Sequence, residues 1–543
     1  MLKLAPLWGC EVSKIVALPR SPQCRLRYLG GLVLVTVLCL PLRSNHQQHR
    51  SIHNMDNLAT ELTDAIIDYL SYKDVINLSL TCRSLRAAAI PMLFHTVSTI
   101  WDGHVSRRCK PVQLLSALLL NPALASYIKC IELRTKKIPF NYSGVPPKPR
   151  VKDDLDTDQL SFFTAAMNAM DLRCADNYLL TEDSFEMITT LLIYQCSNLR
   201  SLTLAAKFSN KNEFLAELIQ RSYAPGAEDP HFGNLSCVTT EYPRRRGEKY
   251  HERYELSATL FKKLFSLPTM RTLDVAFLCP LEPRAKLTSR KEWQELEQEM
   301  LSDSYWPLIE PPISSRLTSL HLTTSSASGS TIRCLLQQTP SLESFRFECA
   351  MPTSVGSLNL REVKRGLDHV RSTLQRLWLS CEFYADQSAE PRSLTSVTEH
   401  SLGSFRKYEQ LTILSVSLAL IFGEVPPAKA PPLADVLPPH VKKWTVREDL
   451  WDYEVFQKWQ PEDMKALFEA FINDDEKGYK NATPELEHVV LDQRDIGSAV
   501  CAYWDEDDES RDVSKLYEDK GIKCTILAPF QFGSSSRGYG EDH

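Results

Sequence analysis

The sequence predicts an α/β chain, with a small helical unit near its N-terminus and an irregular solenoid of parallel strands and helices after it. Two observations predict this class. The apolar residues of positions 58–96 have the spacing of three short helices. Beyond residue 100, a strand motif of the form L-x-x-L-x-L returns nine times, with helix-like apolar segments before several copies. A chain of 543 residues is long enough for both parts.

The helical unit has a start or stop signal at each predicted boundary. The first helix has apolar residues spaced i, i+4, i+5 and i+8 along one helical face, namely Leu62, Ile66, Ile67 and Leu70. Ser71 and Asp74 form an S-x-x-D capping box that predicts the start of a second helix. Thr81 is the predicted cap of a third helix, and Pro91 predicts its end, because proline lacks a backbone donor.

Together these residues resemble an F-box over positions 55–98. The matching positions, in chain order, are Leu58, Glu61, Leu62, Ile66, Ile67, Leu70, Asp74, Val75, Leu78, Leu80, Cys82, Arg83, Leu85, Leu93 and Phe94. The resemblance implies that the helices bind the small adaptor subunit of an SCF-type cullin ubiquitin ligase and that the rest of the chain recruits a substrate for ubiquitination.

The resemblance also implies which residues bind the adaptor. They are Leu58, Leu62, Ile66, Ile67, Leu70, Val75, Leu78, Cys82, Leu85, Leu93 and Phe94. Two positions depart from the family's pattern: Ala59 stands where the family usually has proline, and Leu85 where it usually has tryptophan or phenylalanine. The first change leaves the preceding loop less ordered and the second removes a large buried anchor, so we expect weaker adaptor binding.

The repeated motif is typical of a leucine-rich-repeat solenoid, because alternation sends its apolar residues into a core that neighbouring units share. Its copies lie at 127–133, 198–204, 270–275, 316–322, 341–347, 373–379, 410–416, 440–446 and 485–491. Helix-like segments at 112–119, 185–192 and 332–336 precede three strands, and 461–473 is a further predicted helix. The spacing between copies is irregular, so some repeats are degenerate, missed or interrupted.

The alternation also assigns single residues to faces of the sheet. Trp444 aligns with Leu320 and Leu414 within their motifs, which predicts that it lies in the core. Trp378 aligns instead with His321 and Arg346, between two apolar positions. We therefore expect Trp378 on the exposed face that solenoids use for ligands, unless the register slips by one residue.

The predicted domain boundaries follow from these segments. Residues 1–54 are interpreted as a poorly ordered extension, 55–98 as the F-box, 105–530 as the solenoid and 531–543 as a disordered tail. Loop insertions are expected near 139–158, 222–255, 280–312 and 425–439.

A short apolar segment at 28–42 leaves three readings of the extension open. In the first, residues 1–54 are an untranslated or misassigned start that precedes Met55. In the second, the segment is a membrane anchor, and in the third it belongs to a cleaved signal. Met55 directly precedes the F-box, where a protein of this kind could begin.

Composition points to a binding protein. The net charge of −6 combines abundant charges of both signs, so nothing suggests nucleic acid. The fifteen cysteines form no C-x-x-C pair, and those at Cys130, Cys196, Cys334 and Cys524 lie among apolar residues, as buried free thiols in a reducing compartment do. We therefore expect no metal or other cofactor, and a cytoplasmic or nuclear location.

No catalytic motif appears in the sequence. It contains no phosphate-binding loop, dinucleotide fingerprint, zinc-protease motif or nucleophile elbow. His321, His369 and His488 are predicted to be packed or solvent-facing. We expect a non-catalytic, substrate-recruiting subunit that binds the adaptor, through it a cullin, and an unknown protein substrate. A ligase-independent F-box scaffold and a membrane-anchored leucine-rich-repeat binding protein remain as alternatives.

Overall fold

The computed structural model describes residues 59–101, 110–135, 157–170, 184–205, 208, 212–223, 231–241, 258–276, 314, 316–352, 357–384, 398–423, 425, 429–447, 450, 461–476, 478–492 and 508–527. All of these residues belong to one compact unit. The predictions for 1–54, 280–312 and 531–543 lie outside the described residues, as does nearly all of 139–158.

Three helices open the described chain: α1 (Thr60–Tyr69), α2 (Tyr72–Ser79) and α3 (Arg83–His95). The predicted capping box at the start of α2 is confirmed. The Ser71 hydroxyl oxygen accepts from the Asp74 N–H at 3.3 Å, and the same hydroxyl donates to the Asp74 carboxylate at 2.6 Å. These bonds satisfy the donor that a helix start leaves free and hold the α1–α2 turn.

The boundaries of α3 differ from the prediction. Cys82, not Thr81, is the N-cap, and its sulfur accepts from the Leu85 N–H at 3.5 Å. Thr81 instead donates its hydroxyl to the Leu78 carbonyl, which closes the end of α2. The helix also continues through Pro91 to His95. The packing of Leu93 and Phe94 on hydrophobic clusters outweighs the local preference of proline.

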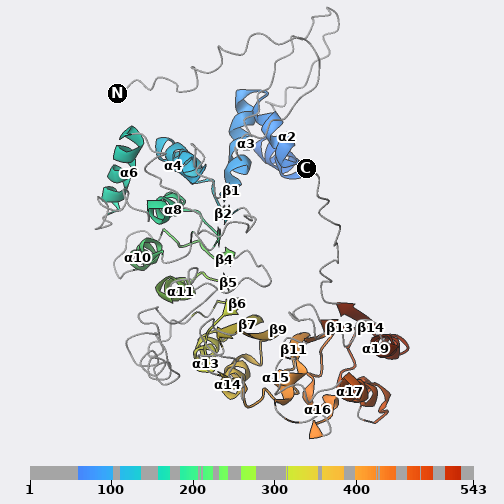
Figure 1. Ribbon diagram of the computed structural model, residues 1–543. Helices are drawn as coiled ribbons and strands as arrows, with labels where there is room; N and C mark the ends of the chain where they lie inside the picture. The colour runs from blue at the N-terminus through green and yellow to red at the C-terminus, as the bar shows by residue number, and fades with distance from the viewer. Residues whose placement is uncertain are drawn as a thin grey trace, which may run out of the picture. The chain divides into compact units, whose positions relative to one another are not determined.

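After the three helices, the main feature of the described chain is a sheet of twelve strands, all paired in parallel (Figure 1). Its strands, in spatial order, are β1 (Thr96–Trp101), β2 (Cys130–Thr135), β3 (Ser201–Ala205), β4 (Cys237–Glu241), β5 (Thr272–Ala276), β6 (Ser319–Ser325), β7 (Ser344–Pro352), β9 (Arg376–Tyr384), β11 (Ile413–Ser417), β12 (Lys443–Arg447), β13 (His488–Asp492) and β14 (Lys523–Leu527). A separate pair joins β8 (Leu358–Asn359) to β10 (Thr398–Glu399). The sheet thus follows chain order, as expected when each unit stacks on the one before it.

The nine predicted strands are confirmed, and each lies in this sheet. The sequence reasoning missed β1, β4 and β14. Strand β4 corrects the expectation that 222–255 is a loop, and it explains the long gap between the second and third predicted strands. Its motif was hidden because Thr240 stands where the last leucine is expected. Thr240 is buried, and its hydroxyl accepts from the Ala276 N–H at 2.7 Å, which offsets the cost of burial.

In the described part of the chain, helices lie between most consecutive strands, and Figure 1 shows α4, α8, α10 and α11 stacked along one side of the strands. Their bounds are α4 (Lys110–Leu120), α5 (Pro122–Ala125), α6 (Thr157–Ala169), α8 (Ser184–Gln195), α10 (Glu213–Ser222), α11 (Ala258–Phe265), α13 (Gly329–Gln337), α14 (Leu360–Val370), α15 (Leu418–Phe422), α16 (Leu433–Val436), α17 (Pro461–Asn473), α18 (Tyr479–Ala482) and α19 (Asp508–Glu518). The predicted helices at 112–119, 185–192, 332–336 and 461–473 are confirmed, whereas α16 lies inside the expected loop 425–439.

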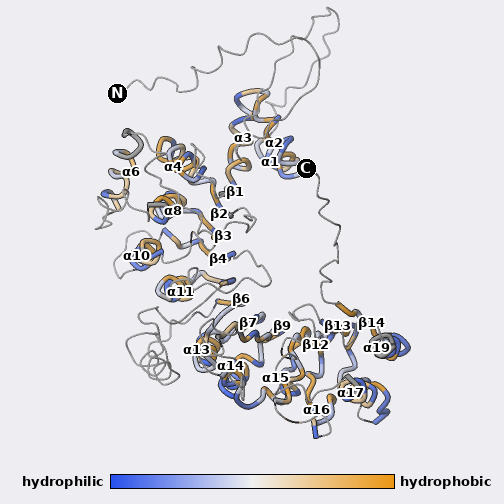
Figure 2. The backbone as a smooth tube through the Cα atoms, in the orientation of Figure 1, coloured by the Kyte–Doolittle hydropathy of each residue, from blue (hydrophilic) through white to orange (hydrophobic). Residues whose placement is uncertain are grey.

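Helix α14 shows why these segments become helices that cover the sheet. Leu360, Val363, Leu367 and Val370 are buried, and their spacing of three and four residues lines one helical face. Polar residues occupy the other face, and Figure 2 shows both a hydrophilic and a hydrophobic side on this helix. The helix can therefore bury one face on the neighbouring units while the other meets water.

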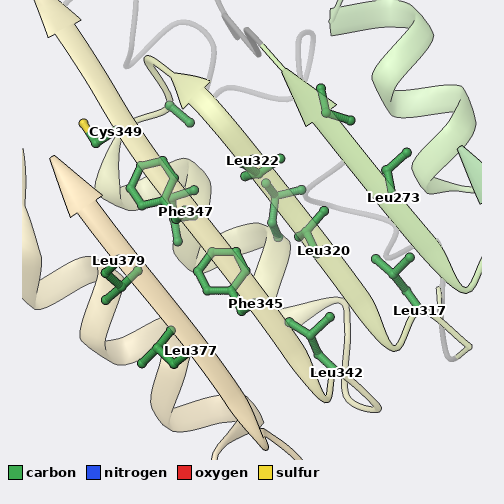
Figure 3. Packing of buried hydrophobic residues seen from close by; sticks show 14 of the residues in the cluster. Leu273, Leu317, Leu320, Leu322, Leu342, Phe345, Phe347, Cys349, Leu377 and Leu379 are labelled. Atoms are coloured by element: carbon green, nitrogen blue, oxygen red, sulfur yellow. The ribbon is translucent and has the colours of Figure 1, made fainter. Parts of the chain in front are cut away.

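The core lies between the helices and the sheet. Leu320 and Leu322 of β6 align in register with Phe345 and Phe347 of β7, and all four are buried, as Figure 3 shows. Trp444 is also fully buried, which confirms its predicted place in the core. Its indole ring packs edge to face on Phe468 of α17, with ring centroids 5.8 Å apart. Each strand therefore sends every second side chain into one shared core.

Cysteines contribute to this interior as free thiols. Cys196, Cys334 and Cys524 are buried and unbridged as predicted, whereas Cys130 is only partly buried. Burial raises the pKa of the Cys196 thiol to about 12, so this group stays protonated and unreactive.

Within the described ranges, no helix has both the length and the apolar character needed to cross a membrane.

Candidate functional site

Helix α1 has apolar residues on two faces. Ile67 is only 2% exposed, and it packs with Val75 and Ala89 in the small core of the three-helix unit, with Leu70 against them. Leu62 and Ile66 point elsewhere and are 56% and 39% exposed. The single stripe predicted from the sequence is therefore two stripes, of which one holds the unit together and one meets solvent.

Tyr69 belongs to the solvent-facing stripe, because it lies three residues after Ile66 and seven after Leu62. It is 92% exposed. We call Leu62, Ile66 and Tyr69 the outer α1 face. Large apolar side chains are rarely left in water as a stripe on a helix unless a partner covers them. The outer α1 face is thus the best candidate for a docking surface in this unit.

The remaining predicted adaptor residues are placed as follows. Leu58 lies outside the described residues. Val75 and Leu85 are buried like Ile67 in the free chain, and their contact with an adaptor stays a prediction. Leu70, Leu78 and Leu93 are partly buried against the same small cluster, Cys82 caps α3, and Phe94 packs against the main core.

Sequence reasoning missed other exposed apolar side chains of the same unit. Tyr72, Leu80 and Met92 are exposed along with Tyr69. The spacing could have identified Tyr69, because it continues the Leu62 and Ile66 stripe. Tyr72, Leu80 and Met92 carry no such periodic signal, and only the packing of the three helices shows that they face out.

The two departures from the family's pattern have clear structural settings. Ala59 is the N-cap of α1 with φ of −56° and makes no side-chain cap hydrogen bond. Its carbonyl accepts from the Leu62 and Thr63 N–H groups at 3.0 and 3.1 Å. Leu85, at the position where the resemblance implies an aromatic residue, is 7% exposed and therefore lies in the interior.

A second candidate surface is the face of the sheet opposite the core, which we call the open face. The register places Asp274, His321, Arg346 and Trp378 in one row across β5, β6, β7 and β9. This confirms the predicted alignment of Trp378 with His321 and Arg346. None of the three is buried, whereas Leu377 and Leu379 beside Trp378 point into the core.

Hydrogen bonds fix the middle of this row. One imidazole nitrogen of His321, Nδ1, lies 3.4 Å from the Asp274 carboxylate. The other, Nε2, lies 3.2 Å from the Ser319 hydroxyl and 3.3 Å from the Ser344 hydroxyl. With partners at both nitrogens, the ring is held in one orientation, which is how a rigid binding surface is built.

The neighbouring Arg346 is held as well, because its guanidinium donates through Nε and Nη2 to Glu348. His321, Arg346 and Trp378 are residue types that dominate binding energy at protein interfaces or orient polar contacts there. The row is therefore a second candidate binding surface, and fixed side chains of this kind would lose little freedom on binding.

No group of three or more histidine, cysteine or acidic side chains in the described part of the chain is arranged to hold a metal ion.

Comparison with known proteins gives one match. A model of the F-box domain matches residues 55–94, a range that includes α1, α2 and all but the last residue of α3. No curated protein sequence matches the chain.

Proposed function

We propose that this protein is the substrate-recruiting F-box subunit of an SCF-type cullin ubiquitin ligase. In this proposal the three-helix unit binds the adaptor subunit and thereby the cullin. The sheet is a degenerate leucine-rich-repeat solenoid, and it binds the protein to be ubiquitinated. The subunit contributes to catalysis only by positioning its substrate.

One observation carries the proposal: the F-box match coincides with a helical unit that leaves a stripe of large apolar residues uncovered. The outer α1 face supplies Leu62, Ile66 and Tyr69 to the adaptor. Ile67, Val75 and Leu85 act indirectly, because they set the angles at which the three helices present this face.

Capture of the purified adaptor by the full chain tests the proposal. We expect Leu62→Asp to abolish capture, because docking would bury an uncompensated carboxylate at a cost of several kcal/mol, roughly 3 or more. The same variant should keep the helical unit folded, since the side chain is exposed in the free protein. Circular dichroism and limited proteolysis check the folding.

Leu120→Asp is the matched control. Leu120 is 64% exposed at the end of α4, outside the three-helix unit, so this change should leave adaptor capture intact. If the wild-type chain fails to capture the adaptor while another F-box protein does so in parallel, the proposal is wrong. Equal capture by wild type and Leu62→Asp would also overturn the assignment of the outer α1 face.

A ligase-independent scaffold is the second candidate. The specific observation that favours it is Leu85, a smaller side chain at a buried position where the family has an aromatic anchor. Absence of adaptor capture together with retained binding of another protein by the sheet would support this alternative.

A further inference from the structure

The open face carries a row of positive charge at the start of the last strands. The first residue of each of these strands, in register, is Arg376, Ile413, Lys443, His488 and Lys523 on β9, β11, β12, β13 and β14. We call Arg376, Lys443, His488 and Lys523 the basic row. The side chains that follow each of them, such as Leu377 and Trp444, are buried in the core, so the basic row faces away from it.

The cations of this row are available to a partner. Arg376, Lys443 and Lys523 are exposed. Among the described residues, no ion pair joins any of the three to a carboxylate, in contrast to Lys442, whose ammonium lies 3.6 Å from Glu485. Burial holds the pKa of His488 below the usual value, and the positive charges of Lys443 and Lys523 on either side lower this pKa further.

The outward positions next to the row carry no charge and add no exposed surface to it. The next outward positions of β11, β12 and β13 are Ser415, Thr445 and Val490, and all three are buried. Further along the strands, the charges of Arg447 and Asp492 face each other at 3.6 Å. The positive charge is therefore confined to an exposed strip one residue wide, with Trp378 next to Arg376 at one end.

We propose that the basic row binds an extended acidic segment of the recruited protein, with carboxylates placed along the row. This inference rests on the proposed function for the identity of the bound protein as a ligase substrate. Charge complementarity carries it, because an uncompensated row of cations on a flat sheet face both attracts an acidic partner and excludes a basic one.

The geometry favours several spaced carboxylates over one phosphate group. Four ladder steps of about 4.8 Å separate Arg376 from Lys523, so the row spans about 19 Å, the length of about six extended residues. Lysine ammonium groups on separate strands act as separated point charges, whereas phosphate recognition uses guanidinium groups converging on one dianion. Only one arginine, Arg376, belongs to the row.

The test is fluorescence anisotropy with a labelled synthetic peptide in which glutamate alternates with serine, and the full chain as its receptor. We expect binding that weakens as salt is added, and no binding of the same peptide with glutamine in place of glutamate. The double variant Lys443→Glu and Lys523→Glu should weaken binding by at least about tenfold. A third peptide carries one phosphoserine and glutamine at the remaining acidic positions.

The matched control is Lys407→Glu with Lys480→Glu, which makes the same change of charge at exposed lysines outside the row. It should bind the glutamate peptide as the wild type does. Equal binding by the two double variants would overturn the proposal, as would tighter binding of the phosphoserine peptide than of the glutamate peptide. Thermal unfolding confirms that both variants are folded.

Adaptor capture, measured on the same preparations, separates this inference from the function on which it rests. If the glutamate peptide binds through the row but the adaptor is not captured, the acidic-segment site stands and the ligase function fails. If the adaptor is captured but the glutamate peptide binds the wild type no more tightly than the double variant Lys443→Glu and Lys523→Glu, the ligase function stands and the site fails.

Discussion

The imidazole of His321 and the indole of Trp378 meet edge to face with their ring centroids 6.3 Å apart, although strand β7 lies between their strands. Strands two ladder steps apart are separated by about 9.6 Å, so the two rings lean toward each other across the position of Arg346. Three strands are thereby linked by side chains on the open face as well as by the core.

This contact should be measurable as a coupling energy. In a double-mutant cycle of His321→Ala and Trp378→Ala, we expect an interaction of about 0.5–1.5 kcal/mol in the free energy of unfolding. Urea denaturation of the four proteins gives the value. Pairing Trp378→Ala with His95→Ala, at the end of α3, is the control and should show additive effects. Additivity of both pairs would contradict the contact.

The row that contains this pair was predictable from the sequence because the strand register is set by buried leucines. Once Leu320 and Leu377 are placed in the core, the period of two residues puts His321 and Trp378 on the opposite face. The hydrogen bonds of His321 were not predictable. They join side chains of β5, β6 and β7, and the motif assigns residues to a face of the sheet without stating which side chains on that face meet.

Thr324 occupies the left-handed region, with φ of 53°, where the register between β6 and β7 shifts. A β-branched residue is strained there by about 1–2 kcal/mol. We expect Thr324→Gly to raise the unfolding free energy by about 0.5–1 kcal/mol, since glycine adopts this conformation freely but gains chain entropy on unfolding. Chemical denaturation measures the change.

The neighbouring Thr323→Gly is the control, because Thr323 is paired with Ala276 in the regular ladder. This substitution should lower the unfolding free energy by about 1 kcal/mol, as glycine does inside a strand. If both glycine variants destabilise the protein equally, the strain at Thr324 is not relieved and the prediction fails.

The three-helix unit shows where sequence reasoning stops. A helical stripe of four apolar residues predicts α1 itself, but Leu62 and Ile67 are only five positions apart and look alike in the sequence. Which of them is buried depends on how α2 and α3 pack against α1, and this is a property of the tertiary structure. Strand β4 was missed for a different reason, because Thr240 is polar and its burial is stabilised by a hydrogen bond from the next strand.

Ala59→Pro should stabilise the three-helix unit. The φ of Ala59, −56°, already lies in the range that proline adopts, and the Ala59 N–H forms no hydrogen bond with another described residue. The gain should be about 0.4–1 kcal/mol, because proline restricts the unfolded chain. Slower amide exchange in α1 measures it, and Glu61→Pro, two residues further along the chain, is the comparison. An unchanged or faster exchange in Ala59→Pro would refute this expectation.

Arg447 and Asp492 form an ion pair at a site where the carboxylate is only 3% exposed. Asp492→Asn removes the charge that faces the guanidinium, and we expect a loss of about 3–5 kcal/mol in unfolding free energy. Replacing both residues, as Arg447→Met with Asp492→Leu, should cost less, since no buried charge is then left. Denaturant midpoints distinguish these outcomes, with the exposed Asp475→Asn as the control expected to change little.

His488 gives the basic row a pH dependence whose sign can be stated. Its ring lies between Lys443 of β12 and Lys523 of β14, with Nε2 2.9 Å from the Thr525 hydroxyl, and its pKa lies below the usual value. The imidazole is therefore neutral at neutral pH. An acidic peptide on the row favours the protonated ring, so binding takes up a proton and affinity should rise as the pH falls below about 6.5. Stability changes the other way, because the unfolded chain binds this proton more readily than the folded one.

Anisotropy titrations between about pH 7.5 and pH 5.5 should show the rise in affinity in the wild type and lose it in His488→Gln. His440→Gln, which alters an exposed histidine paired with Glu485, should keep it. A rise that survives in His488→Gln would assign the pH dependence to another group.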